Sequence, residues 1–167
     1  MCIRDSSIGH HGNAILLRPY LQLKTLKALD LPGLEPRGAV LATVTGPGIR
    51  LSVGGLHLGL RRRDRLIQMA HVLDAAQEFS GPIILGGDLN EWHKTKGLLP
   101  PGSSWTEIAP GPSFHASAPH FKLDRFVIHG AVSIASHGVV SKQSAERASD
   151  HLPIWIDVEL DDQKISS

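Results

Sequence analysis

Apolar residues follow a strand-like pattern along most of the chain and a helical spacing in one segment, and together these patterns predict a mixed α/β (α+β) fold. Most apolar residues lie in short runs that are β-branched or alternate with polar ones, and turn residues separate these runs. Residues 39–45 and 49–58 flank the turn "GPG", so we expect them to pair as a hairpin. The predicted strands are residues 13–18, 22–29, 39–45, 49–58, 83–85, 123–128, 132–136 and 152–160.

In residues 62–79 the apolar side chains have helical spacing, which predicts a helix with one buried stripe. Gly81 and Pro82 are expected to stop this helix. The apolar residues of the stripe are Leu66, Met69, Ala70, Leu73 and Ala76. Residues 97–119, rich in Pro, Ser and Gly, are predicted to form a long loop, and such loops are often functional.

The organisation of the chain points to one domain without internal repeats. "MCIRDS" is typical of translated adaptor sequence, so residues 1–8 are interpreted as a non-native or disordered start. Residues 9–160 are predicted to form a partial domain, and residues 161–167 a polar tail.

Composition narrows the classes of protein that need to be considered. The chain has 167 residues, 41% hydrophobic and 20% charged, with a formal net charge of +1, as in ordinary globular domains. The single cysteine, Cys2, excludes a disulfide framework and a cysteine-rich zinc site. No apolar run is long enough to span a membrane and no signal peptide is visible, so we expect a cytoplasmic monomer.

The stretch "PIILGGDLNEW" ends an apolar run with a carboxylate and a carboxamide. Asp88 and Asn90 are separated by one residue, so in an extended chain their side chains would leave the same face. Gly86 and Gly87 would let the backbone turn and approach a ligand. An acid can bind a hard cation or accept a proton from water, and an amide can donate to a phosphoryl oxygen. A plain Asp/Asn turn fits the same letters.

Four further residues could join such a site. Asp150 and His151 precede the last predicted strand, and both can face one site only at a strand end or bend. Asp124 precedes another strand and could orient a histidine by fixing its tautomer. His57 ends the strand before the helix. Each of them also has a structural interpretation, as a turn, cap or surface residue.

Other chemistries are poorly supported. The ten histidines lack the HExxH spacing of a zinc site, and no G-x-S-x-G elbow indicates a serine hydrolase. The basic run Arg61–Arg65 is either a solvated helix face or a means to attract a phosphate-bearing substrate. Aromatic residues are only 5% and form no base-stacking row, so a nucleic-acid partner is not specifically indicated.

The motifs GNAILLR, HLG, GGDLN, LDR and SDHLP follow one another in this order. The order resembles the endonuclease/exonuclease/phosphatase family, the metal-dependent phosphoesterases related to DNase I and to the exonuclease III type of abasic-site nuclease. The resemblance extends from about Gly9 to Leu160. It implies a DNase I-like four-layer sandwich: two β-sheets packed face to face, with helices outside and the site at one edge.

The resemblance also implies roles for the acids and the amide. Asp88 looks like the acid that positions or deprotonates the attacking water and that contacts the metal. Asn90 looks like the donor to the phosphoryl oxygen, and Asp150 looks like a metal ligand. The implied metal is Mg²⁺, for which Mn²⁺ often substitutes.

The histidines receive their roles in the same way. His151 looks like the imidazole that contacts the phosphate, oriented by Asp124. His57 is similar to the family's other histidine that faces the phosphate. The implied partner is a phosphate ester, whose class the sequence leaves open.

Two elements of the family pattern have no match in this chain. The family's first strands supply an Asn and a metal-binding Glu, whereas this chain begins at the GNAILLR strand, with Leu17 where Ser is frequent. The chain therefore resembles an N-terminally truncated domain. Two hypotheses remain: a metal-dependent phosphodiester hydrolase, or a catalytically impaired fragment or homologue that binds phosphorylated ligands without turnover.

Overall fold

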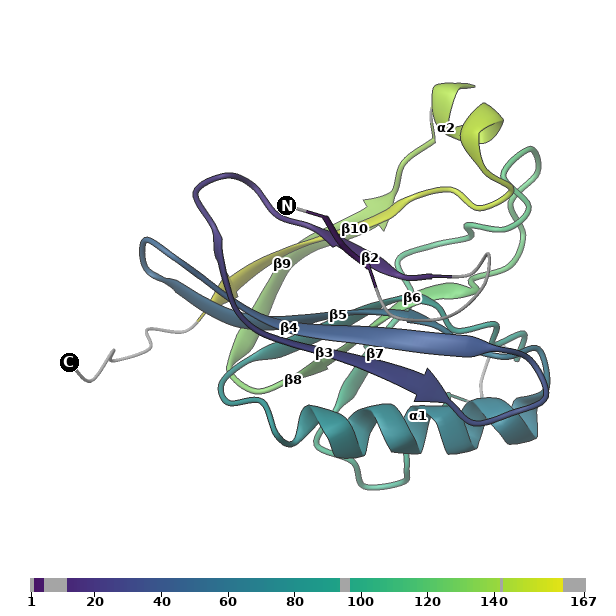
Figure 1. Cartoon of the computed structure of the whole chain (residues 1–167). Helices are drawn as coiled ribbons and strands as arrows, with labels where there is room; N and C mark the ends of the chain where they lie inside the picture. Colours follow the sequence, from purple (N-terminus) through teal and green to yellow (C-terminus); the bar gives the residue numbers. More distant parts are fainter. Residues whose placement is uncertain (1, 5–11, 94–96, 142, 161–167) are drawn as a thin grey trace.

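Six strands pair into the central sheet of the molecule (Figure 1). The computed structural model describes residues 2–4, 12–93, 97–141 and 143–160. Within the sheet the strands lie in the order β3-β4-β5-β6-β8-β7. Their bounds are β3 Gln22–Leu31, β4 Arg37–Gly46, β5 Ile49–His57, β6 Ile83–Asp88, β7 Thr106–Ile108 and β8 Asp124–His129. The predicted hairpin of β4 and β5 is confirmed, with Gly46 opposite Ile49.

Helix α1 (Arg62–Ala76) connects β5 to β6, which pair in parallel. Parallel neighbours need such a crossover, and the helix covers one face of the central sheet (Figure 1). Leucines of β3, β4 and β5 meet Met69, Val72 and Leu73 there in the buried core. The ends of β5 and β6 are thereby fixed side by side, and the predicted site residues lie at these ends.

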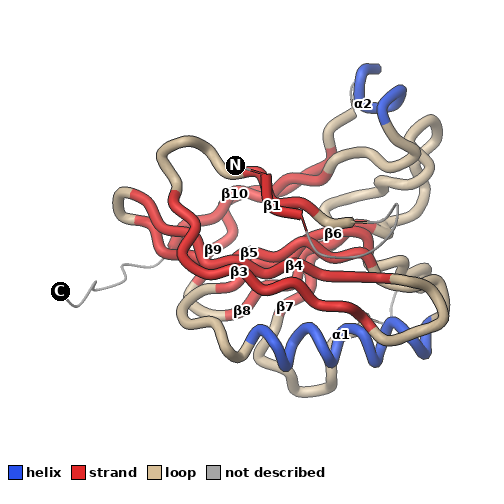
Figure 2. Tube along the Cα trace, in the orientation of Figure 1, coloured by secondary structure: helices blue, strands red, loops and turns tan. Residues whose placement is uncertain are grey.

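A second β layer faces the other side of the sheet (Figure 2). It consists of two two-stranded antiparallel sheets, β1 with β2 and β9 with β10. An apolar cavity of about 550 Å³ lies between the layers, lined by residues such as Leu16, Val53 and Phe126. The bounds are β1 Cys2–Arg4, β2 Ala14–Leu16, β9 Val132–Val139 and β10 Ile154–Leu160, with the short helix α2 (Gln143–Ala148) before β10.

The expected mixed α+β class and layered β-sandwich are confirmed. The predicted polar tail, residues 161–167, and most of the predicted non-native start, residues 1–8, lie outside the described residues. Among the helices of the described residues, none has the length and apolar character needed to cross a bilayer.

The predicted helix stripe is confirmed at Met69, Leu73 and Ala76 but is wrong at Leu66 and Ala70. Leu66 is 43% exposed, and Ala70 also faces solvent. The stripe begins instead with two polar side chains that have partners inside the fold. Gln68 accepts a hydrogen bond from Gly59 N (2.8 Å) and donates to Pro32 O (2.9 Å). The buried residues of α1 are Arg65, Gln68, Met69, Val72, Leu73, Ala75 and Ala76.

Two other expectations are corrected by the backbone. The predicted loop of residues 97–119 contains the short edge strand β7. Gly86 and Gly87 do not turn the chain, because β6 continues through them to Asp88. Their role is close strand packing: Gly87 has φ of 148°, and a Cβ there would overlap the carbonyl of Leu56. The chain turns two residues later, at Asn90, whose φ is 49°.

Candidate active site

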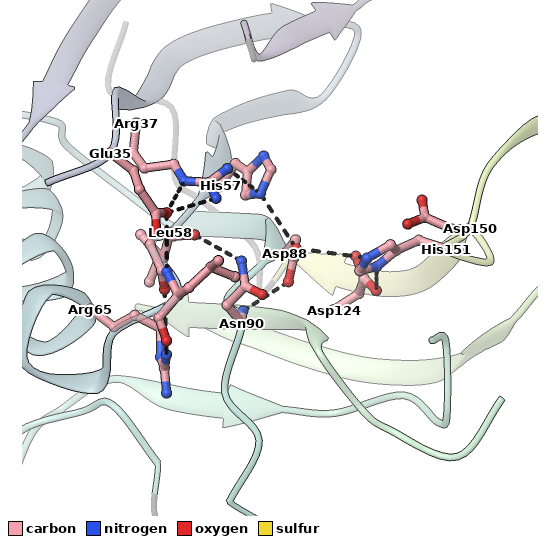
Figure 3. A network of polar contacts seen from close by, with 12 residues as sticks. Glu35, Arg37, His57, Leu58, Arg65, Asp88, Asn90, Asp124, Asp150 and His151 are labelled. Atoms are coloured by element: carbon pink, nitrogen blue, oxygen red, sulfur yellow. Dashed lines mark hydrogen bonds and ion pairs between the residues drawn. The ribbon is translucent and has the colours of Figure 1, made fainter. Parts of the chain in front are cut away.

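Three ionisable side chains lie side by side on adjacent strands of the central sheet (Figure 3). His57, at the end of β5, is opposite Asp88, at the end of β6. Asp88 is in turn opposite Asp124, at the start of β8. Because residues opposite each other on neighbouring strands point to the same face, these three side chains form one row. His151 reaches the row from the segment just before β10, where it forms an isolated bridge with Phe114.

A pocket of about 590 Å³ opens over this row. Its lining includes every residue that the sequence put forward: His57, Asp88, Asn90, Asp124, Asp150 and His151. Residues that are up to 94 positions apart in the chain therefore share one cavity. Their functional roles remain predictions.

His151 and Asp124 form a hydrogen-bonded pair. His151 Nδ1 lies 2.7 Å from Asp124 Oδ2, which also accepts a hydrogen bond of 2.5 Å from Ser113 Oγ. The hydrogen bond to Asp124 raises the pKa of His151, against partial burial, and the negative charges of Asp124, Asp88 and Asp150 add to the rise. With Nδ1 bound to Asp124, the Nε2–H of His151 points into the pocket, 3.8 Å from Asp88 Oδ2.

Asp88 is a partly buried carboxylate that lies between His57 and His151. Burial raises the pKa of this carboxyl; the hydrogen bond that Asn90 N donates to Oδ1 (2.8 Å) opposes the rise, and Asp124 adds to it. Its other oxygen, Oδ2, lies 3.5 Å from His57 Nε2. A raised pKa makes a carboxylate a better proton acceptor.

Asn90 does not adopt the extended geometry that the sequence suggested. Its left-handed backbone turns the side chain toward the neighbouring loop, where Nδ2 donates to Leu58 O (2.9 Å). The residue is only 4% exposed. Asn90 thus ties the end of β6 to the segment after β5, and it still lines the pocket.

Ligand atoms of Asp88, Asp124 and His151 lie within 4.8 Å of one another, close enough to surround one metal ion. This donor set of two carboxylates and one imidazole fits a divalent cation. Asp124 Oδ2 is already occupied by two hydrogen bonds, which leaves Asp88 as the better placed carboxylate. Asp150 is exposed and lines the same pocket outside this group of three.

Arg37 is a pocket residue that sequence reasoning missed. Its Nη1 lies 2.6 Å from His57 Nε2, and since a guanidinium can only donate, the imidazole nitrogen accepts. Glu35 Oε2 holds the same guanidinium through Nε (3.2 Å) and Nη2 (2.9 Å). The signal was present in the hairpin register, because Gly38 pairs with His57 and so places its neighbour Arg37 at the same strand end.

The basic run at the start of α1 is not simply a solvated helix face. Arg65 is 2% exposed, and its Nη2 lies 3.4 Å from Glu91 Oε1. Arg62 pairs with the other oxygen of Glu91, and Arg65 Nη1 donates to Leu60 O (2.5 Å). Burial lowers the pKa of Arg65, and the charge of Glu91 opposes that effect. These arginines hold the backbone around the pocket.

Comparison with solved structures supports this architecture. An endonuclease/exonuclease/phosphatase family protein from Bacteroides thetaiotaomicron superimposes with a TM-score of 0.80, at 15% identity over 96% of this chain and 75% of that chain. A humanized D. rerio TDP2 gives 0.77, at 18% identity over 95% of this chain and 76% of that chain. The Bacteroides thetaiotaomicron mannosyl-6-phosphatase Bt3783 gives 0.74, at 15% identity over 89% and 71%. These likenesses show the fold.

Sequence comparison extends the likeness beyond the fold. The protein YbhP of Escherichia coli (strain K12) is 28% identical over 163 residues, which cover 91% of this chain. The chain spans 64% of the length of that relative. A family model described as Endonuclease/Exonuclease/phosphatase family matches residues 3–151. With most of its length matched in this way, the chain belongs to the endonuclease/exonuclease/phosphatase family.

Proposed function

We propose that this chain carries the site of a metal-dependent phosphodiester hydrolase. The observation that carries the proposal is the convergence of Asp88, Asp124 and His151 on one pocket, with their ligand atoms within 4.8 Å of one another. Two close carboxylates need a cation beside them, and a phosphoryl group needs donors and positive charge. The pocket offers carboxylates for a cation and imidazole and guanidinium groups for a phosphoryl group.

Asp88 is assigned to the attacking water. Its carboxylate is buried and its pKa is raised, so it accepts a proton more readily than an ordinary aspartate. The backbone bond from Asn90 fixes the orientation of Oδ1 and leaves Oδ2 toward the pocket. Asp88 would therefore hold the water in line with the phosphorus and take up its proton.

The two histidines are assigned to the phosphoryl oxygens. Asp124 fixes His151 so that Nε2–H donates into the pocket, and the raised pKa of His151 favours the cation that phosphate attracts. His57 borders the same space beside the guanidinium of Arg37, which adds positive charge. Asn90 would add a further amide donor.

Mg²⁺ is the proposed metal, and Mn²⁺ would substitute for it. Magnesium commonly binds through one or two carboxylates together with waters and substrate phosphate oxygens, and Asp88 and Asp150 supply two carboxylates at this pocket. When bound, the ion would polarise a phosphoryl oxygen and neutralise the charge that grows on it.

A second function, binding without turnover, is favoured by one observation. Among the described residues, the acids that line the pocket are Asp88, Asp124 and Asp150, and glutamate is not among them. The resemblance implies a metal-binding glutamate, so a site built from these aspartates alone would hold a phosphate ester with weaker activation.

Hydrolysis of bis-p-nitrophenyl phosphate separates the two functions. We expect turnover with Mg²⁺ or Mn²⁺, abolished by EDTA and lost in Asp88→Ala. Asp30→Ala, which removes an exposed aspartate of β3, serves as the matched control and should retain activity. A folded protein that binds phosphate but releases no p-nitrophenol at millimolar metal would favour the binding function.

The substrate is proposed only as a phosphate ester. TDP2 of D. rerio has been solved with a single-strand DNA product, and Bt3783 is a mannosyl-6-phosphatase, so similar folds serve both nucleotide and sugar phosphates.

A further inference from the structure

A second pocket, of about 390 Å³, adjoins the proposed phosphoryl pocket. Trp92 lines both cavities, so this side chain forms the wall between them. A molecule with its phosphoryl group over Asp88 could therefore extend past Trp92 into the second pocket. Nothing in the proposed chemistry uses this space.

The wall between the pockets continues as a chain of aromatic rings. Trp92 contacts Phe121 with a centroid distance of 4.9 Å and an interplanar angle of 62°. It also meets Phe114 edge to face at 5.8 Å and 82°, and Phe114 lies 4.9 Å from the ring of His151. Trp92 is 43% exposed and Phe121 42% exposed. Aromatic surface left open beside a polar pocket is suited to stack a planar ligand group.

A buried guanidinium holds the walls of the second pocket in place. Arg125 is 7% exposed, and its Nη2 donates to the backbone carbonyl of Glu91 at 2.7 Å. Its Nε donates to Lys122 O (3.0 Å), so one side chain joins the segment that carries Trp92 to the segment that carries Phe121. The pocket is therefore formed before a ligand arrives, which lowers the entropic cost of binding.

The charges around the pocket indicate what it would accept. Lys122, His93 and His120 are exposed in its lining. Among the described residues, Glu91 is the one acid that lines this pocket. It is 1% exposed and paired with Arg62 and Arg65. A neutral ring linked to phosphate fits these groups, whereas a cationic ligand does not.

We propose that this second pocket, with Trp92 and Phe121 as its stacking surface, binds the base of a nucleotide whose phosphate occupies the Asp88 pocket. The inference rests on the proposed function, because it needs the phosphate at that place. It narrows the substrate class from phosphate esters in general to nucleotide esters, and it disfavours sugar phosphates that lack a planar ring.

Calorimetric binding of two matched ligands tests this assignment, and it needs no turnover. Thymidine 5′-monophosphate has a base that deoxyribose 5-phosphate lacks, and both carry the same phosphate. In the presence of Mg²⁺ we expect the nucleotide to bind at least about tenfold more tightly, since stacking on one aromatic side chain has about that effect. Trp92→Ala should remove most of this preference, and Trp92→Phe should retain most of it.

Trp155→Leu is the matched control, because Trp155 is 39% exposed and lies on β10, outside the lining of both pockets. It should leave the preference intact. Equal binding of the two ligands to the wild type, or an equal loss of both in Trp92→Ala, would overturn the assignment of the second pocket while leaving the phosphoryl site standing. If neither ligand binds at millimolar concentration, the proposed function fails and this inference fails with it.

Discussion

Two acids three residues apart, Asp88 at the end of β6 and Glu91 just after it, lie in different electrostatic surroundings. Glu91 is 1% exposed and is flanked by the guanidinium groups of Arg62 and Arg65. Asp88 opens onto the pocket and has a second carboxylate, Asp124, as its neighbour across the sheet. Glu91 is paired with two guanidinium groups, whereas Asp88 faces two imidazoles and a second carboxylate.

This difference in charged neighbours distinguishes Glu91, a residue of the scaffold, from Asp88, a residue of the proposed site. A buried charge with its partners in place belongs to the packing and leaves no binding capacity for a ligand. At Asp88 burial raises the pKa and the charge of Asp124 adds to the rise, against the charges of His151 and Arg37, so a metal ion beside this carboxylate would be favoured. Substitutions at Glu91 and at Asp88 or Asp124 can alter the two sides separately.

Glu91→Gln should have the largest effect on stability. The substitution leaves the buried charge of Arg65 without its anion, and breaking such a pair typically costs about 3–5 kcal/mol. Urea unfolding of the metal-free protein measures the loss. Glu159→Gln on β10 is the control and should unfold like the wild type. A Glu91→Gln loss below about 1 kcal/mol, in the range of surface pairs, would show that the arginines find other partners and that Glu91 is not a scaffold residue.

Asp124→Asn should lower turnover about 100-fold, since general acid–base and orienting groups contribute on that scale. The asparagine removes the charge that holds the proton on His151. The pKa of His151 should fall, and the decline in activity at alkaline pH should begin at lower pH than in the wild type.

Asp124→Asn should also change how the stability of the fold depends on pH. Because the folded state raises the pKa of His151, its protonation stabilises the fold below the unfolded pKa of about 6.5, and this contribution is lost as pH rises through the folded value. Asp124→Asn should lose stability mainly on the acidic side. A pH–rate profile and an NMR titration of His151 provide the measurements, with Asp157→Asn, an exposed aspartate of β10, as control. An unchanged profile would mean that Asp124 does not act through His151.

The strands could be predicted from the sequence, but the buried face of α1 could be predicted only in part. Alternation and turn residues locate β3 to β5 because these are local signals. The stripe was wrong at Leu66 and Ala70 because apolar content was used as the guide to burial. Arg65 and Gln68 are buried instead, through hydrogen bonds to the segment just before the helix and to Pro32. The strand β7 was missed because a three-residue edge strand depends on its neighbour β8 rather than on its own composition.

The residues of the site could be found, but not their geometry. Asp88, Asp124 and His151 belong to motifs that the sequence displays, while their row depends on the order β5-β6-β8, which no local pattern encodes. Arg37 could have been found from the register of the hairpin. The rings around Trp92 could not, because Phe114 and Phe121 reach it only through the folded loop.

Asp88→Asn should abolish activity and yet make the metal-free protein more stable. Because the folded state raises the pKa of Asp88, its ionisation costs stability, and this cost grows as pH rises from the unfolded pKa of about 3.9 through the folded value. The asparagine keeps an acceptor for Asn90 N and removes the charge. We expect a gain of about 0.5–1 kcal/mol at neutral pH, in the range of other site residues that trade stability for function.

Thermal unfolding in EDTA measures this gain, and it should disappear as pH falls below the unfolded pKa. Lower stability of Asp88→Asn at neutral pH would mean that the carboxylate is compensated within the fold, like Glu91, and the contrast between the two acids would be lost.

Glu78→Gln should have the smallest effect, because it makes the same substitution as Glu91→Gln at an exposed ion pair. Lys27 Nζ and Glu78 Oε1 lie 2.6 Å apart, but the two side chains are 34% and 63% exposed. Water and salt screen such a pair, so its loss should cost less than about 0.5 kcal/mol. Urea unfolding of Glu78→Gln beside Glu91→Gln compares an exposed pair with a buried one in the same protein. Similar losses in the two variants would show that burial does not set the strength of these pairs, and the buried arginines could then no longer be distinguished as scaffold.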